Sequence, residues 1–415
     1  MSFFEIAAIF MVLTALFAYL NYRDIKLPTT IGVMAVALVV STLIATLGSY
    51  SLIEVQQHAR QVMASINFDE ALLHGLLSFL LFAGSLHINL GDLGQQKWAI
   101  TLLSTVGVIL STVIVGGLTW LLLDLLGTPI PLLPCLLFGA LISPTDPVAV
   151  IGILKIAGAP NSIETKITGE SLFNDGIGVV VFMILLELMK LGGTVSTSRM
   201  LNLLLEEAVG GVVLGLAAGY LAFQMLKRVN NYQVEIIITL GLVKGMYALA
   251  DHLHTSGPIS VVVAGLLIGN HGRQFAMSDD TREHLDSFWE LMDEILNASL
   301  FMLIGLKVLI MEFTPRLFLA GLLAIVITLF ARWTSVGGTV MALIPFRRFS
   351  PGAVRILTWG GLRGGISVAL ALSLPNLPRR DEIIATTYLI VIFSIIVQGL
   401  SLGRLIKQIY PAEPV

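Results

Sequence analysis

Long runs of apolar residues alternate along this chain with short polar segments. A helix needs about 20 apolar residues to cross a bilayer, and on that measure the sequence predicts about thirteen spanning helices. Their approximate ranges are 3–20, 28–48, 71–89, 98–126, 132–156, 164–190, 200–227, 233–250, 256–270, 288–311, 315–342, 351–374 and 383–408. The segments 51–66 and 279–287 are polar enough to lie at the membrane surface. The pattern predicts an all-α polytopic membrane protein.

Composition supports this fold class. Hydrophobic residues make up 56% of the 415 positions and charged residues only 12%, whereas soluble domains carry about 25% charged residues. The single cysteine, Cys135, excludes internal disulfides and a thiolate metal site. A net charge of −3 without a basic cluster gives no indication of nucleic-acid binding. No Lys or Arg precedes the run 3–20, so we interpret it as a retained helix and not a signal peptide.

The distribution of Lys and Arg predicts the orientation. With the N-terminus outside, fourteen of these residues fall in cytoplasmic loops and the C-terminal tail, and seven fall on the opposite face. The other three, Lys244, Arg332 and Arg363, lie within helices. Because cytoplasmic loops are enriched in Lys and Arg, this bias favours an outer N-terminus and a cytoplasmic C-terminus. We therefore expect a multi-pass protein of the inner (plasma) membrane.

Two of the predicted helices, the fifth and the twelfth, contain helix breakers at matching positions. Proline removes a backbone N–H and leaves carbonyl groups unpaired, which is tolerated at membrane depth only where the backbone lines a cavity or is buried in protein. Matching breaks predict two inverted six-helix repeats with the seventh helix as a linker, and broken helices that cross in the core. The breakers are Pro144, Pro147, Gly360, Gly361, Gly364 and Gly365.

Three carboxylates, Asp146, Glu170 and Asp175, lie inside the predicted fifth and sixth helices. A charge at the bilayer centre costs at least ~2.5–3.5 kcal/mol, so such residues indicate function. Helical periodicity gathers the polar residues of the sixth helix on one face. If the broken fifth helix packs there, Asp146 and Asp175 converge on one cation. Oxygen ligands suit Na⁺, K⁺ or Li⁺, and the further candidates are Thr145, Ser171 and Asn174.

Three segments of the sequence resemble a known family. Ser143-Pro-Thr-Asp-Pro147, Glu170-Ser-Leu-Phe-Asn-Asp-Gly176 and Gly360-Gly-Leu-Arg-Gly-Gly365 are similar to the signature segments of NhaP/NHE-type monovalent cation:proton antiporters, the sodium/proton exchangers. The resemblance implies a homodimer and an alternating-access transporter. It places the dimer part at about 1–90 and 233–311, the core at about 98–190 and 315–408, and a linker helix at about 200–227.

The resemblance also implies roles for individual residues. Asp175 would carry both the proton and the cation, and Asn174 before it marks the class associated with electroneutral exchange. Glu170 would form a structural salt bridge, preferentially with Arg332, although Arg363 is an alternative partner. Many bacterial members have a third-helix glutamate where this chain has Ala83, which leaves the ion preference open.

Burial and a neighbouring carboxylate both favour the protonated form of an acid, so one site can hold either a proton or a cation. We therefore expect electroneutral exchange of one H⁺ for one Na⁺, Li⁺ or K⁺, serving pH and salt homeostasis, with no cofactor and no enzymatic reaction. A K⁺/H⁺ antiporter is the nearest alternative, and a cation channel is a distant one. An intramembrane aspartyl protease lacks its expected Gly-x-Gly-Asp setting here.

Overall fold

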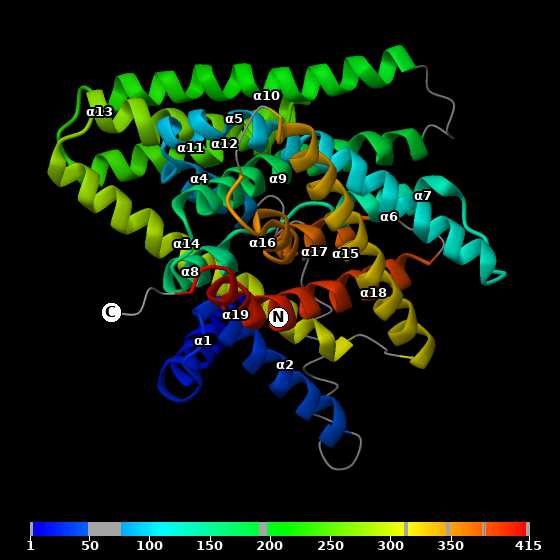
Figure 1. Cartoon of the computed structure of the whole chain (residues 1–415). Helices are drawn as coiled ribbons and strands as arrows, with labels where there is room; N and C mark the ends of the chain where they lie inside the picture. The colour runs from blue at the N-terminus through cyan, green and yellow to red at the C-terminus, as the bar shows by residue number, and fades with distance from the viewer. Residues whose placement is uncertain are drawn as a thin grey trace.

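The computed structural model describes residues 3–48, 76–190, 197–310, 314–345, 349–375, 377 and 379–411, and within them the chain is helical without strands (Figure 1). The first half contains α1 (Phe3–Leu20), α2 (Thr29–Gly48), α4 (Leu77–Leu86), α5 (Leu90–Ser104), α6 (Val106–Leu125), α7 (Leu132–Ile142), α8 (Val148–Ala157) and α9 (Asn161–Lys190). The second half contains α10 (Thr197–Leu226), α11 (Tyr232–His252), α12 (Gly257–Leu267), α13 (Arg273–Phe275), α14 (Asp279–Lys307), α15 (Pro315–Leu343), α16 (Ala353–Trp359), α17 (Gly365–Leu372), α18 (Arg380–Phe393) and α19 (Gly399–Ile409).

The all-α membrane fold is confirmed. Among the described residues, eight helices are long and apolar enough to cross a bilayer. The fifth predicted helix is the pair α7 and α8, and the twelfth is the pair α16 and α17, so both predicted breaks are present. The total of thirteen helices and the inverted repeats stay predictions, and the expected surface segment 51–66 lies outside the described residues.

Two helix starts differ from the sequence prediction. Helix α14 begins at Asp279, so the polar segment 279–287 forms its first turns. Ser278 caps this end, because its Oγ accepts a hydrogen bond from the backbone N–H of Thr281 at 3.3 Å. The fourth predicted helix is interrupted at Thr105, which separates α5 from α6, and α5 begins earlier than expected, behind the cap residue Asn89.

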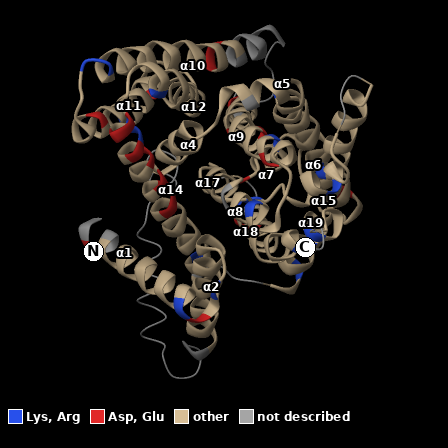
Figure 2. Cartoon of the chain, turned by 60° about the vertical axis from the view of Figure 1, so that its left-hand side comes forward, with Lys and Arg blue, Asp and Glu red and all other residues tan. Residues whose placement is uncertain are grey.

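The helices pack as two groups. In one group α14 runs along α2, and α12 lies against α4 and α10. In the other, α6 packs on α7 and α15, α9 packs on α5 and α7, and α15 packs on α18. The groups meet where α9 contacts α10 and α12 and where α14 contacts α17. Charged residues are sparse on these helices, and several acidic ones lie along α14 (Figure 2).

Small residues explain the close contact between α10 and α12. A Cβ atom at Gly215 would lie 2.5 Å from the carbonyl oxygen of Ser260, and one at Gly219 would lie 3.1 Å from the Cα of Ala264. Spacing of four residues places both glycines on one face of α10. Because lipid provides no hydrophobic force between helices, such close backbone approach is a main source of packing energy in membranes.

Candidate functional site

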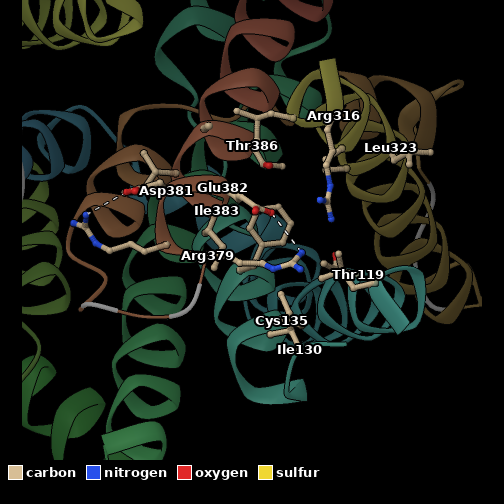
Figure 3. A pocket seen from close by; sticks show the side chains of 18 of the residues that line it. Thr119, Ile130, Cys135, Arg316, Leu323, Arg379, Asp381, Glu382, Ile383 and Thr386 are labelled. Atoms are coloured by element: carbon tan, nitrogen blue, oxygen red, sulfur yellow. Dashed lines mark ion pairs between the residues drawn. The ribbon is translucent and has the colours of Figure 1, made fainter. Parts of the chain in front are cut away.

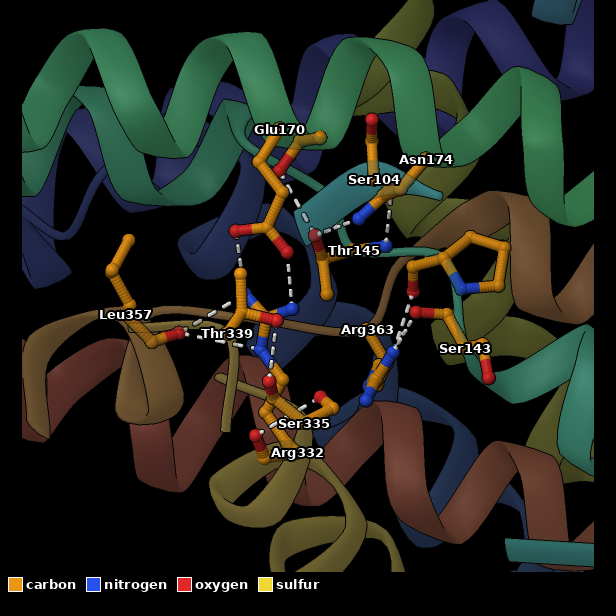
Figure 4. A network of polar contacts seen from close by, with 12 residues as sticks. Ser104, Ser143, Thr145, Glu170, Asn174, Arg332, Ser335, Thr339, Leu357 and Arg363 are labelled. Atoms are coloured by element: carbon orange, nitrogen blue, oxygen red, sulfur yellow. Dashed lines mark hydrogen bonds and ion pairs between the residues drawn. The ribbon is translucent and has the colours of Figure 1, made fainter. Parts of the chain in front are cut away.

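The two helix breaks meet in the middle of the second group of helices. Between α7 and α8 the backbone N–H of Asp146 donates a hydrogen bond to the carbonyl oxygen of Leu362 at 2.8 Å. In return, the guanidinium of Arg363 donates to the carbonyl oxygens of Ser143 and, at 3.0 Å, Pro144 (Figure 4). Arg363 is 2% exposed. A buried cation thus pairs the carbonyl groups that the proline break releases.

Four glycines let the second break approach its neighbours. A Cβ atom at Gly364 would lie 2.0 Å from Oδ2 of Asp146, and one at Gly361 would lie 2.5 Å from Nε of Arg332. At Gly365 it would lie 2.2 Å from the side chain of Leu300 on α14, and at Gly360 it would lie 2.8 Å from the carbonyl oxygen of Ile356. Pro144 is buried and Pro147 is half-buried at the ends of the first break.

The polar face of α9 binds the first break through Thr145. The amide Nδ2 of Asn174 donates to Thr145 Oγ1 at 2.7 Å, and its Oδ1 accepts from the backbone N–H of Thr145 at 3.2 Å. Thr145 Oγ1 and Ser171 Oγ lie 3.0 Å apart, within hydrogen-bond distance. All three side chains are buried. This arrangement orients the Thr145 hydroxyl, and it uses both amide atoms of Asn174.

Asp175 follows Asn174 on α9 and lies beside this network. It is 5% exposed, and its Oδ1 has no hydrogen-bond partner among the described residues. Asp146 is half-buried and lies near enough for its charge to act on Asp175. A buried carboxylate oxygen without a partner destabilises the folded protein unless a cation or a proton binds to it.

Glu170 forms a buried salt bridge with Arg332 on α15. Both guanidinium nitrogens Nη1 and Nη2 donate to the carboxylate, the latter to Oε2 at 2.9 Å. Arg332 also donates from Nε and Nη2 to the carbonyl oxygen of Leu357, at 3.3 and 3.1 Å. Of the two partners that the sequence left open, Arg332 therefore contacts Glu170, whereas Arg363 contacts the first break (Figure 4).

Sequence reasoning missed residues on the helix opposite the second break. A π-helical turn, Ser394–Gln398, separates α18 from α19. The Oγ of Ser394 accepts from the backbone N–H of Arg363 at 2.8 Å, and Gln398 donates to the carbonyl oxygen of Trp359 at 3.0 Å. Such turns are frequent at functional sites. Polar residues within an otherwise apolar run were the signal that could have indicated this contact.

Helix α4 carries no carboxylate, and Ala83 is buried within it. A carboxylate from another helix lies near the site. Asp293 on α14 is half-buried, and its charge interacts with that of Asp146. Asp293 therefore belongs to the surroundings of the site, on a helix from the other group.

Two half-helices that cross at their breaks, beside an unsatisfied buried carboxylate, define a secondary transporter. The chain belongs to the sodium/hydrogen exchanger family, because the family described as "Sodium/hydrogen exchanger, transmembrane" matches residues 12–408.

Curated relatives and a solved structure agree with this assignment. The chain is 50% identical to the Na(+)/H(+) antiporter NhaP of Pseudomonas aeruginosa over 99% of its own length and 98% of the relative's. It is 36% identical to the Na(+)/H(+) antiporter NhaH of Halobacillus dabanensis over 93% of both chains. The fold matches the sodium proton antiporter MjNhaP1 of Methanocaldococcus jannaschii at pH 8, with a TM-score of 0.76, 20% identity and 98% of both chains covered.

Proposed function

We propose that this protein exchanges Na⁺ for H⁺ across the membrane, with Asp175 as the group that binds either ion. The observation that carries the proposal is the buried, unpaired Oδ1 of Asp175, next to the Asp146 carboxylate and the Thr145–Ser171 hydroxyl pair. The close relationship to proteins named Na(+)/H(+) antiporters supports Na⁺ as the cation and does not favour the K⁺/H⁺ alternative.

Competition for one site couples the two fluxes. When Asp175 is protonated it is neutral and its oxygens attract a cation weakly; when it loses the proton it binds Na⁺ with oxygen ligands from Asp146, Thr145 and Ser171. Asn174 holds Thr145 in position for this step. In both loaded states the charge of Asp175 is neutralised, so the core carries the same net charge whether it holds H⁺ or Na⁺.

Two other charged groups near the site are held in place by fixed partners within the protein. Glu170 and Arg332 form a pair, and Arg363 is held by carbonyl oxygens of the first break. One titrating group per transport cycle then gives one H⁺ for each Na⁺, which is electroneutral. A membrane voltage imposed on proteoliposomes should therefore leave the exchange rate unchanged, and a voltage-dependent rate would contradict this stoichiometry.

The division into moving and static parts belongs to the same proposal, and the packing of the helices in two groups supports it. We assign the core to about 98–190 and 315–408, the dimer part to about 1–90 and 233–311, and the linker to about 200–227. The homodimer, the outer N-terminus and the cytoplasmic C-terminus in the inner membrane are part of the same proposal. They rest on the family and on the Lys and Arg bias of the sequence.

The test is antiport in inverted membrane vesicles loaded with a pH-sensitive dye. Addition of Na⁺, Li⁺ or K⁺ in turn gives the ion preference, and we expect Na⁺ to release protons most strongly. Asp175→Ala should abolish the signal, because the neighbouring carboxylate on α9, Glu170, is held by Arg332 and cannot replace Asp175. Lower pH should raise the KM for Na⁺ while leaving the rate at saturating Na⁺ nearly unchanged. An active Asp175→Ala variant would remove this residue from its role.

A further inference from the structure

A large cavity lies among the ends of several helices (Figure 3), and no residue of the two breaks lines it. Its volume is about 1210 Å³, at or above the upper end of the range for small-molecule sites. The ends of α6, α7, α15 and α18 line it, together with Thr128 and Ile130 between α6 and α7. Asp146 and Asp175 are not among its lining residues, so the cavity is separate from the ion site.

The cavity is amphipathic. Its walls are mainly apolar, and among the side chains that form them are Leu122, Leu123, Phe138, Leu323 and Ile327. Its polar part contains four basic residues, Lys307, Arg316, Arg379 and Arg380, against two acidic ones, Asp381 and Glu382. The site therefore combines a net positive region with a long apolar surface.

The arginines differ in how many hydrogen bonds and ion pairs their guanidinium groups already form within the protein. Arg380 donates from Nε and Nη2 to the carbonyl oxygens of Leu374 and Leu372, both at 2.7 Å. It thereby caps the C-terminal end of α17. Arg379 lies 3.6 Å from Glu382, which leaves part of its guanidinium open. Arg316 is exposed and has no ion-pair partner among the residues that the structure describes. Its side chain extends from α15 toward Arg379 (Figure 3).

The surroundings of the cavity indicate what kind of molecule could reach it. Large apolar side chains are exposed on the same helix ends, including Trp120 at 41%, Leu126 at 61%, Phe318 at 53% and Leu319 at 59%. In a membrane protein such a surface faces lipid. The four basic residues are more than half of the seven Lys and Arg that the proposed orientation puts on the outer face, a face where such residues are generally depleted.

We propose that this cavity binds an acidic phospholipid from the outer leaflet, with its phosphate at Arg316 and Arg379 and its acyl chains along α6, α7 and α15. Arginine binds phosphate oxygens in a bidentate manner, which suits two guanidinium groups at one end of the site. The apolar walls would exclude water from the acyl chains. This binding goes beyond ion exchange and does not depend on it.

Native mass spectrometry of the purified protein in detergent tests the proposal. Phosphatidylglycerol and phosphatidylcholine with identical acyl chains are added in turn, and the wild type should retain the acidic lipid preferentially. Arg316→Gln with Arg379→Gln should weaken its retention about tenfold, the loss expected for removing a charge-assisted contact. Ala320→Trp, which fills the apolar wall, should weaken it with all arginines present. Arg23→Gln, at an exposed residue paired with Asp24, is the matched control and should bind like the wild type.

Three results would overturn the proposal. The first is no preference of the wild type for phosphatidylglycerol, and the second is equal retention by the double variant and the Arg23→Gln control. The third is displacement of the lipid by glycerol 3-phosphate at equal concentration, which would assign the site to a soluble phosphate. Thermal unfolding of each variant shows that it is folded. If the double variant is not, Arg316→Gln alone decides, because the described contacts of Arg316 include no ion pair.

Discussion

The buried pair of Glu170 and Arg332 gives the prediction whose magnitude follows most directly from the contacts. The two side chains are 1% and 7% exposed, and the guanidinium also donates to the carbonyl oxygen of Leu357. Glu170→Gln keeps an oxygen in place but removes the negative charge that compensates Arg332. Breaking a buried pair in this way costs about 3–5 kcal/mol, because an uncompensated charge remains.

The double variant Glu170→Leu with Arg332→Met separates charge from packing. It removes both charges, and apolar replacement of a buried pair is often nearly neutral. The carbonyl oxygen of Leu357 then loses its donor, at a cost of about 1 kcal/mol. We therefore expect the double variant to recover most of the stability that Glu170→Gln loses.

Thermal unfolding of the purified protein in detergent measures these differences. The Tm of Glu170→Gln should fall by about 3–6 °C and that of the double variant by clearly less. The control is Arg282→Met, which breaks the exposed pair with Asp279 and should change the Tm little. If Glu170→Gln unfolds at the wild-type temperature, or if the double variant is as unstable as the single one, the reasoning about a structural pair is wrong.

Three further substitutions test the site itself in the vesicle assay. Gly364→Ala should strongly reduce transport, because the new Cβ would lie 2.0 Å from Oδ2 of Asp146; a near-normal rate would mean that the second break shifts freely. Asn174→Ala removes both hydrogen bonds to Thr145 and should raise the KM for Na⁺ about tenfold, whereas an unchanged KM would assign Asn174 no positioning role. Asp293→Asn should raise the KM for Na⁺ without lowering the maximal rate, since it removes a nearby negative charge, and Glu294→Gln is its neighbouring control.

The sequence predicted the parts of the site that local chemistry determines. Pro144 and Pro147 remove backbone donors from a helix, and four glycines clustered around Arg363 weaken one, so both breaks were predictable. Helical periodicity likewise placed Asn174 and Asp175 on one polar face of α9. The apolar runs predicted the broad fold, because crossing a bilayer requires a minimum helix length.

What the sequence could not provide depends on contacts between distant segments. The family resemblance favoured Arg332 as the partner of Glu170, but the residues alone left Arg363 open, because the choice depends on which arginine the packing of distant helices brings to Glu170. The contact of Ser394 with Arg363 requires the π-helical turn, which no periodicity in the run 383–408 predicts. The charge of Asp293 acts on that of Asp146 because α14, a helix of the other group, packs against α17.

Proton release on Na⁺ binding tests the central claim most directly. Purified protein in a weakly buffered solution with a pH indicator is titrated with NaCl, with choline chloride as the control salt, at a pH where the site is protonated. The account predicts about one proton released per Na⁺ bound to the wild type, since the two ions compete for one carboxylate, and no release from Asp175→Asn. Na⁺ binding without proton release, or equal release from Asp175→Asn, would contradict the account.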